Sequence, residues 1–91
     1  MQNNKLFNIL TYLDKSEIVR CRKYLHSPYF NNSENLANLF ELFLELVVKD
    51  AEEIPKEKIW KKIFPKEKYD DVRFRKLCSD LLKLIEGFLA Q

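Results

Sequence analysis

The segment from residue 34 to residue 49 constrains the fold more than any other part of the sequence. Five of its polar residues recur every three or four positions and form one thin stripe: Glu34, Asn38, Glu41, Glu45 and Lys49. Leucine, phenylalanine and valine fill most of the remaining circumference. A helix with so narrow a polar edge has to be covered by neighbouring helices on its other sides. We therefore predict a central helix around which the rest of the chain packs.

Glycine and proline are scarce, which disfavours folds that need many turns. The 91 residues include one glycine and three prolines, and 46% of them are hydrophobic. A chain of this length forms one domain and buries only roughly 60 to 65% of its unfolded surface, so its stability depends on dense packing. The composition predicts an all-α domain over residues 1–91, arranged as a compact five-helix bundle with a central third helix. An apolar helical pattern also continues past Gly87, as it would in the amino-terminal domain of a longer protein.

Capping residues and prolines place the other four helices. We expect the first helix at about residues 4–12. The second helix should begin after the N-cap Asp14, which forms a capping box with Glu17, and should end before Pro28. Ser33 or Asn32 should open the central helix. The fourth helix is predicted between Pro55, in its first turn, and Pro65.

The predicted fifth helix, after the N-cap Asp70, is apolar over half of its helical wheel from Phe74 to Leu89, with only Val72 misplaced. Such a split is typical of a helix on the outside of a bundle. We expect it to pack on the central helix together with the second helix.

The cysteines and apolar runs bear on the compartment. Cys21 and Cys78 fall on the predicted buried faces of two helices, and we interpret both as reduced core residues. The apolar run after Lys5 is broken at Asn8 and lacks a signal-peptide cleavage site. Polar residues also interrupt the longest apolar stretch well before the ~20 residues that span a bilayer. A cytoplasmic protein without a membrane segment is predicted.

No residue pattern predicts catalysis or cofactor binding. His26 is the only histidine, and Cys21 lies about 140° around the helix from it, so the two cannot share a metal site locally. Glu41 and Glu45 could pair their carboxylates, but they belong to the exposed stripe of the central helix, where nothing apolar raises a pKa. Gly87 is the only glycine, so no glycine-rich loop can bind phosphate. We expect no enzyme activity, no cofactor and no metal.

Charge alternates along the chain and leaves two interpretations open. Residues 32–54 carry one Lys and six Asp or Glu, whereas residues 56–76 carry nine Lys or Arg and four Asp or Glu. In one interpretation, both blocks are solvated faces that partly neutralise each other after folding. In the other, the basic block is a functional patch.

The functional version of the basic patch is a helix-turn-helix over residues 56–89. Arg73 and Lys76 would lie at the exposed start of a recognition helix, and four lysines would contact flanking phosphates: Lys61, Lys62, Lys66 and Lys68. This region is loosely similar to the winged-helix domains of bacterial response regulators in its Ile59-Trp60 and Phe64-Pro65 pairs and in residues 73–77. Against this alternative stand the negative charges of Asp70 and Asp71, a turn longer than usual and the lack of a following β-hairpin.

The run Ser27-Pro28-Tyr29-Phe30-Asn31 places two aromatic residues in the loop before the central helix. Their rings either fix the loop onto the core or form an exposed anchor for a partner protein. Arg20 and Lys23 on the second helix are further candidate contacts. Our leading hypothesis is a non-enzymatic interaction or structural domain that docks onto a protein partner or onto the remainder of a longer chain; nucleic acid is the alternative partner.

Residues 19–31, which contain this run, together with Phe64-Pro65, residues 69–71 and residues 79–82, resemble an uncharacterised family of bacterial proteins. In that family an amino-terminal helical domain precedes a long helical remainder. The resemblance covers most of the chain and favours an interaction domain within a longer bacterial protein. It implies no activity, ligand or site residue.

Overall fold

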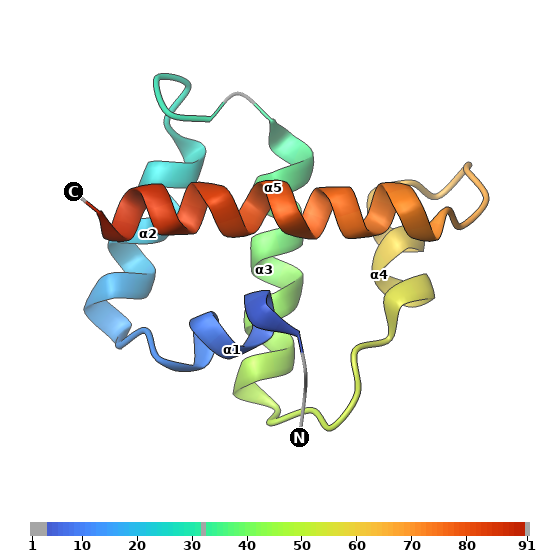
Figure 1. The fold of residues 1–91 in the computed structure, drawn as a ribbon, viewed down its shortest axis with the longest axis horizontal. Helices are drawn as coiled ribbons and strands as arrows, with labels where there is room; N and C mark the ends of the chain where they lie inside the picture. The colour runs from blue at the N-terminus through green and yellow to red at the C-terminus, as the bar shows by residue number, and fades with distance from the viewer. Residues whose placement is uncertain (1–3, 32, 91) are drawn as a thin grey trace.

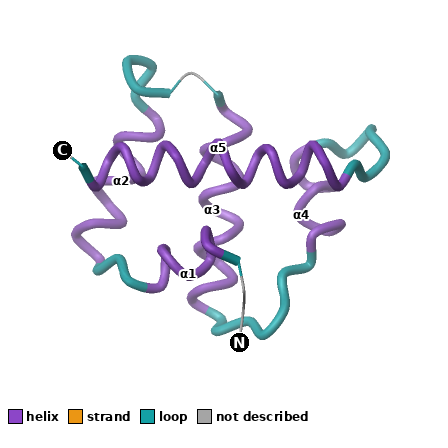
Figure 2. Tube along the Cα trace, viewed as in Figure 1, coloured by secondary structure: helices purple, strands orange, loops and turns teal. Residues whose placement is uncertain are grey.

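The chain folds into helices and connecting loops. The computed structural model describes residues 4–31 and 33–90 and contains, within them, no strand (Figure 2). Its helices are α1 (Lys5–Thr11), α2 (Lys15–His26), α3 (Glu34–Val48), α4 (Lys56–Ile63) and α5 (Asp71–Leu89) (Figure 1). The predicted all-α, five-helix architecture is confirmed.

Helix α3 is the centre of the bundle, and each of the other four helices packs against it (Figure 1). Its buried side chains are Leu36, Ala37, Leu39, Phe40, Phe43 and Leu44. In the last turn, Leu46 and Val47 are partly buried against the core, whereas Val48 is 84% exposed, because this end of α3 extends past the helices that cover the rest of it. The predicted wrapping of the apolar residues of α3 therefore holds except at Val48.

Most helices begin at the predicted capping residues. Asp14 and Glu17 form the capping box of α2, the Ser33 side chain accepts a hydrogen bond from Leu36 N, and Asp70 caps α5. Asn32, the other candidate cap of α3, lies outside the described residues. Pro55 occupies the N-cap of α4, one position before the predicted first turn.

Helix α5 runs across the bundle and packs on α1, α2 and α3 (Figure 1). Phe74, Leu81 and Ile85 are its buried residues, and Val72 is exposed as expected. Leu89, the last residue of α5, was predicted on the buried face but is substantially exposed. The buried residues of α1 are Leu6, Phe7 and Leu10.

Cys21 is buried and Cys78 is partly buried, and both are free thiols. Within the residues that the structure describes, no helix is both long and apolar enough to span a bilayer.

Candidate protein-interaction surface

Four aromatic rings meet where α2, the loop after it and the end of α5 come together. The rings of Tyr24 and Phe30 stack with centroids 4.3 Å apart and planes 17° apart. Phe88 meets Tyr24 edge-on at 5.6 Å, and Tyr29 meets Phe30 edge-on at 4.9 Å. We call Tyr24, Tyr29, Phe30 and Phe88 the open cluster.

The only glycine of the chain lies beside this cluster. A Cβ added to Gly87 would lie 3.3 Å from the Tyr24 hydroxyl oxygen, closer than an ordinary van der Waals contact. The missing side chain thus lets Tyr24 approach α5 closely. Tyr24 and Phe88 were not predicted as site residues, because their meeting depends on how α2 and α5 cross.

Hydrogen bonds hold the loop that carries Tyr29 and Phe30. The Ser27 carbonyl accepts from the backbone N–H groups of Phe30 (3.1 Å) and Asn31 (2.9 Å). The Asn31 amide donates to the carbonyls of Leu25 (2.8 Å) and Ser33 (3.1 Å), and its oxygen accepts from Ser33 N (3.0 Å). The Asn31 side chain therefore ties the end of α2 to the start of α3, and the loop between them is constrained.

The two loop aromatics differ in exposure. Tyr29 is 87% exposed and Phe30 is 41% exposed. Phe30 is fixed against Tyr24, while Tyr29 projects from it into solvent. Phe30 therefore fits the interpretation of a ring that fixes the loop onto the core, and Tyr29 fits that of an exposed anchor. Exposed Leu89 and partly buried Phe88 extend the apolar surface onto α5.

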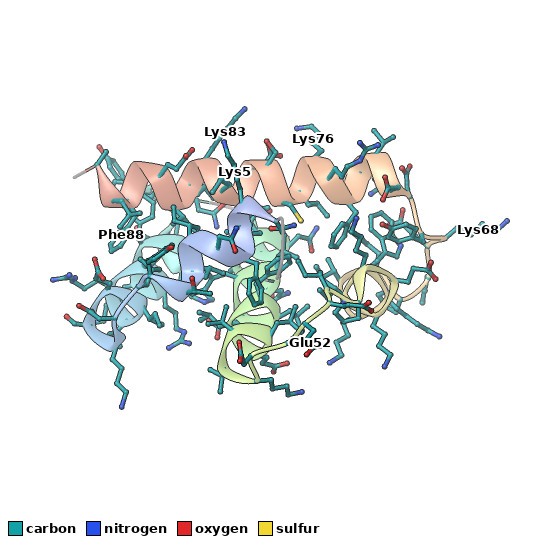
Figure 3. All side chains as sticks on the ribbon, turned by 60° about the horizontal axis from the view of Figure 1, so that its bottom comes forward. Lys5, Glu52, Lys68, Lys76, Lys83 and Phe88 are labelled. Carbon is teal, nitrogen blue, oxygen red and sulfur yellow. The ribbon has the colours of Figure 1, made fainter. Side chains whose placement is uncertain are left out.

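Basic side chains border the open cluster along α2. Arg20 lies one turn before Tyr24 and lines, with Glu17, Phe88 and Leu89, a shallow hollow of about 430 Å³ between α2 and the end of α5. Lys23 is also exposed. Neither basic side chain has an ion-pair partner in residues 4–31 and 33–90. The predicted contacts Tyr29, Phe30, Arg20 and Lys23 therefore lie on α2 and on the loop that follows it. Figure 3 shows Phe88 on the side of α5 that faces α2.

Arg22, between these two cations, has a different role. Its Nε and Nη2 atoms donate to the two carboxylate oxygens of Glu41 on α3, at 2.6 and 3.0 Å. The pKa of Arg22 is raised, first by this hydrogen bond. Glu41, predicted on the exposed stripe of the central helix, is instead half-buried in a bidentate ion pair that joins α2 to α3.

A second group of rings occupies the turn between α4 and α5. The ring centroid of Trp60 lies 4.6 Å from that of Phe64 and 5.8 Å from that of Tyr69, and the centroids of Tyr69 and Phe74 are 6.1 Å apart. Trp60 and Phe74 are buried, and Trp60 Nε1 donates to the Glu67 carbonyl at 3.1 Å. We call Trp60, Phe64, Tyr69 and Phe74 the closed cluster.

Arg73 covers this closed cluster. Its guanidinium carbon lies 5.1 Å from the ring centroids of both Trp60 and Phe64, and its Nη1 pairs with the Glu67 carboxylate at 2.7 Å. This ion pair raises the pKa of Arg73. Arg73, predicted at the start of a recognition helix, thus contacts residues of α4 and of the turn before α5.

The other candidate nucleic-acid contacts fall into two groups. Lys76 pairs with Asp80 one turn along α5, at 3.1 Å. Four exposed lysines have no ion-pair partner among the described residues: Lys61, Lys62, Lys66 and Lys68. Lys68 projects outward from the turn in Figure 3. The structure therefore keeps the predicted phosphate contacts available, while Arg73 and Lys76 have carboxylate partners.

The potential nucleophiles are protonated at neutral pH. Burial raises the pKa values of both Cys21 and Cys78 to about 11, and a thiol is a weak nucleophile. In the described ranges, no three His, Cys, Asp or Glu side chains are grouped so that they could hold a metal ion.

Comparison of the chain with protein-family models, curated proteins and solved structures gave no match.

Proposed function

We propose that the chain is a non-enzymatic protein-interaction domain and that the open cluster, with Arg20 and Lys23, is its docking surface. The observation that carries this proposal is an almost fully exposed tyrosine on a loop constrained by backbone and Asn31 hydrogen bonds. Exposed tyrosines are frequent binding hot spots. A constrained loop also loses little conformational entropy when a partner binds.

The charge around the open cluster supports an inference about the chemistry of the partner. Arg20 and Lys23 carry positive charge without a carboxylate partner in the described part of the chain. We infer that the ligand is a protein segment with an aromatic or aliphatic side chain for the rings and adjacent Asp or Glu for the two cations. This segment belongs to another protein or to the remainder of a longer chain. The free cysteines fit a reducing compartment such as the cytoplasm.

Selection from a displayed random peptide library tests this proposal. Wild-type chain should enrich peptides that combine apolar and acidic residues, and a Tyr29→Ala, Phe30→Ala double variant should lose them. Tyr12→Ala is the matched control, because Tyr12 is 84% exposed but lies at the end of α1. No enrichment on wild type, or equal binding to the double variant, would contradict the proposal.

A nucleic-acid interface is the second candidate, favoured by four lysines around α4 and the following turn that have no ion-pair partner among the described residues. Phosphate contacts by Lys61, Lys62, Lys66 and Lys68 would give an affinity for duplex DNA that falls steeply as salt is raised. A duplex titration at low salt, with Lys61→Glu, Lys62→Glu as the variant and Lys23→Glu as the control, tests it. Absence of binding, or equal loss in both variants, would exclude this interface.

A further inference from the structure

The acidic and basic blocks of the chain do not neutralise each other through ion pairs. Residues 32–54 carry one Lys and six Asp or Glu, and residues 56–76 carry nine Lys or Arg and four Asp or Glu. Within residues 4–31 and 33–90, Glu41 is the only residue of the acidic block in an ion pair, and its partner Arg22 lies on α2. The other ion pairs lie between residues 67 and 80. Opposite charges of the two blocks therefore stay without direct contact inside one molecule.

Both blocks border one hollow of about 240 Å³ between the second half of α3 and α4. Each helix lines it with residues three, four or seven positions apart, a spacing that places side chains on one helical face. From α3 and its C-cap come Leu42, Glu45, Leu46 and Lys49; Pro55, Lys58 and Lys62 come from α4 and its N-cap. Leu42 and Leu46 are partly buried and Pro55 is exposed, so the hollow offers apolar surface beside its charges.

The loop between α3 and α4 closes one end of this hollow, since its flanking residues Lys49 and Pro55 both line it. Three carboxylates in the loop are exposed: Asp50, Glu52 and Glu53. They outnumber Lys49 and make this end acidic. Figure 3 shows Glu52 on the loop.

The α4 side of the hollow is basic. Lys58 and Lys62 are exposed and lie roughly one and two turns beyond Pro55. In the portion of the chain that the structure describes, neither these lysines nor the loop carboxylates have an ion-pair partner. One surface therefore carries adjacent acidic and basic groups that are open to an outside partner.

Hydrogen bonds hold the acidic loop where it leaves α3. The Asp50 N–H donates to the Val47 carbonyl at 3.1 Å, and the Ala51 N–H donates to the Leu46 carbonyl at 3.0 Å. This pattern ends a helix with a residue in the left-handed conformation, and Asp50 has a φ of 52°. The start of the loop is thus fixed relative to α3, which reduces the entropy lost on binding.

We propose that a second copy of this chain docks on the hollow and forms a two-fold symmetric dimer. In a two-fold interface every contact occurs twice, so a surface with adjacent acidic and basic groups complements itself. Glu52 and Glu53 of each copy pair with Lys58 and Lys62 of the other, around the apolar part of the hollow. Because the open cluster lies on α2, the loop after it and α5, this inference does not rest on the proposed docking function.

Sedimentation velocity over a range of protein concentrations tests the dimer. At low salt, the average mass should rise with concentration from that of one chain toward twice this value. The exposed pairs are screened by salt, so self-association should weaken by about tenfold or more between about 0.01 and 1 M salt. A Tyr29→Ala, Phe30→Ala variant should associate as wild type does. Loss of association in that variant would overturn the proposal, because the open cluster would then be the interface.

Reversal of the charges tests which residues meet. Lys58→Glu, Lys62→Glu and Glu52→Lys, Glu53→Lys should each weaken self-association by at least about tenfold, because like charges then face each other across the interface. An equimolar mixture of the two variants should regain the mass of a dimer, since each reversed pair then meets the opposite charge. All four side chains are exposed, so the circular dichroism spectra should match that of wild type.

Lys66→Glu, Lys68→Glu is the charge-matched control. Both lysines are exposed but lie in the turn after α4, away from the hollow, and this variant should associate as wild type does. A wild-type chain that stays monomeric at every concentration in low salt would overturn the proposal. A mixture of the reversed variants that stays monomeric, or an equal loss in the control, would also overturn it, since the acidic and basic groups would then not meet.

Discussion

The chain contains two aromatic clusters of similar composition at opposite ends of α5, and they differ in how their polar atoms and ring faces are covered. In the closed cluster, Trp60 Nε1 and the Tyr69 hydroxyl have hydrogen-bond acceptors, and Arg73 lies over two rings. In the open cluster, Tyr29 and one side of Phe30 face solvent, and the neighbouring cations have no carboxylate partners in residues 4–31 and 33–90.

This difference separates stability from binding. Rings that are buried and have all polar atoms paired contribute to the free energy of unfolding. Rings held in place but left uncovered contribute little to it and remain available to a partner. The loop hydrogen bonds of Asn31 are needed for the second role, since they fix the position of a side chain that has almost no packing of its own.

Removal of Trp60 should have the largest effect. Trp60→Ala deletes a buried indole and leaves a cavity under Arg73, and we expect a loss of about 3 to 5 kcal/mol in the free energy of unfolding. Urea unfolding followed by circular dichroism measures this loss. If the variant does not fold, Trp60→Phe should still be destabilised by more than Tyr12→Ala. A Trp60→Ala chain as stable as wild type would show that the closed cluster is not structural.

Arg73→Ala tests the cover of the closed cluster. It removes two cation–π contacts and one half-exposed ion pair, and we expect urea to unfold the variant at a lower concentration than wild type. Arg75→Ala is the matched control, because its ion pair with Asp71 lies within one helix turn and is more exposed. Equal losses of stability in the two variants would mean that the contacts of Arg73 with the rings do not contribute to the free energy of unfolding.

Tyr29→Ala should leave the free energy of unfolding within about 0.5 kcal/mol of wild type, because this ring is almost fully exposed. Thermal and urea unfolding check this value. A loss as large as that of Arg73→Ala would place Tyr29 among the structural residues and would weaken the contrast between the clusters.

Alkaline pH should affect the closed cluster through Tyr69. Burial, and then the hydrogen bond to Asp71, raise the pKa of Tyr69 from 10.0 to about 12, so the folded state holds this proton more tightly than the unfolded state. The contribution is complete below pH 10.0 and is lost as the pH rises toward 12. A Tyr69→Phe variant should lack this loss, as measured by unfolding across that range.

Cys21 and Cys78 act in the same direction, since their pKa values are raised from 9.0 to about 11, but both remain in the Tyr69→Phe chain. The difference in the free energy of unfolding between wild type and variant should therefore change only above pH 10.0, where wild type loses the contribution of Tyr69. A difference that keeps the same size from neutral to alkaline pH would show that Tyr69 acts by packing alone.

The elements of the fold could be predicted because their signals are local. The polar stripe of α3, the capping box at Asp14 and the cap at Asp70 each involve residues within one or two helical turns. The extent of cover was less predictable. Val48 continues the apolar pattern of α3, and only the placement of the other helices leaves it in solvent.

The candidate sites required tertiary structure. Tyr29 and Phe30 could be identified from the sequence, but their contact with Tyr24 and Phe88 depends on the crossing of α2 and α5. Arg73 has the sequence position of a base-reading residue, and only the location of Trp60 and Phe64 shows that its guanidinium lies over their rings.

The affinity of one selected peptide for two variants gives the most direct test of the contrast between the clusters. Tyr29→Ala, Phe30→Ala should weaken binding by about 30-fold or more, the loss expected for a hot spot of at least about 2 kcal/mol, and should stay folded. Arg73→Ala should change the affinity less than about threefold while lowering stability. An affinity that falls with Arg73 and is unchanged by loss of Tyr29 and Phe30 would contradict the assignment of binding to the open cluster.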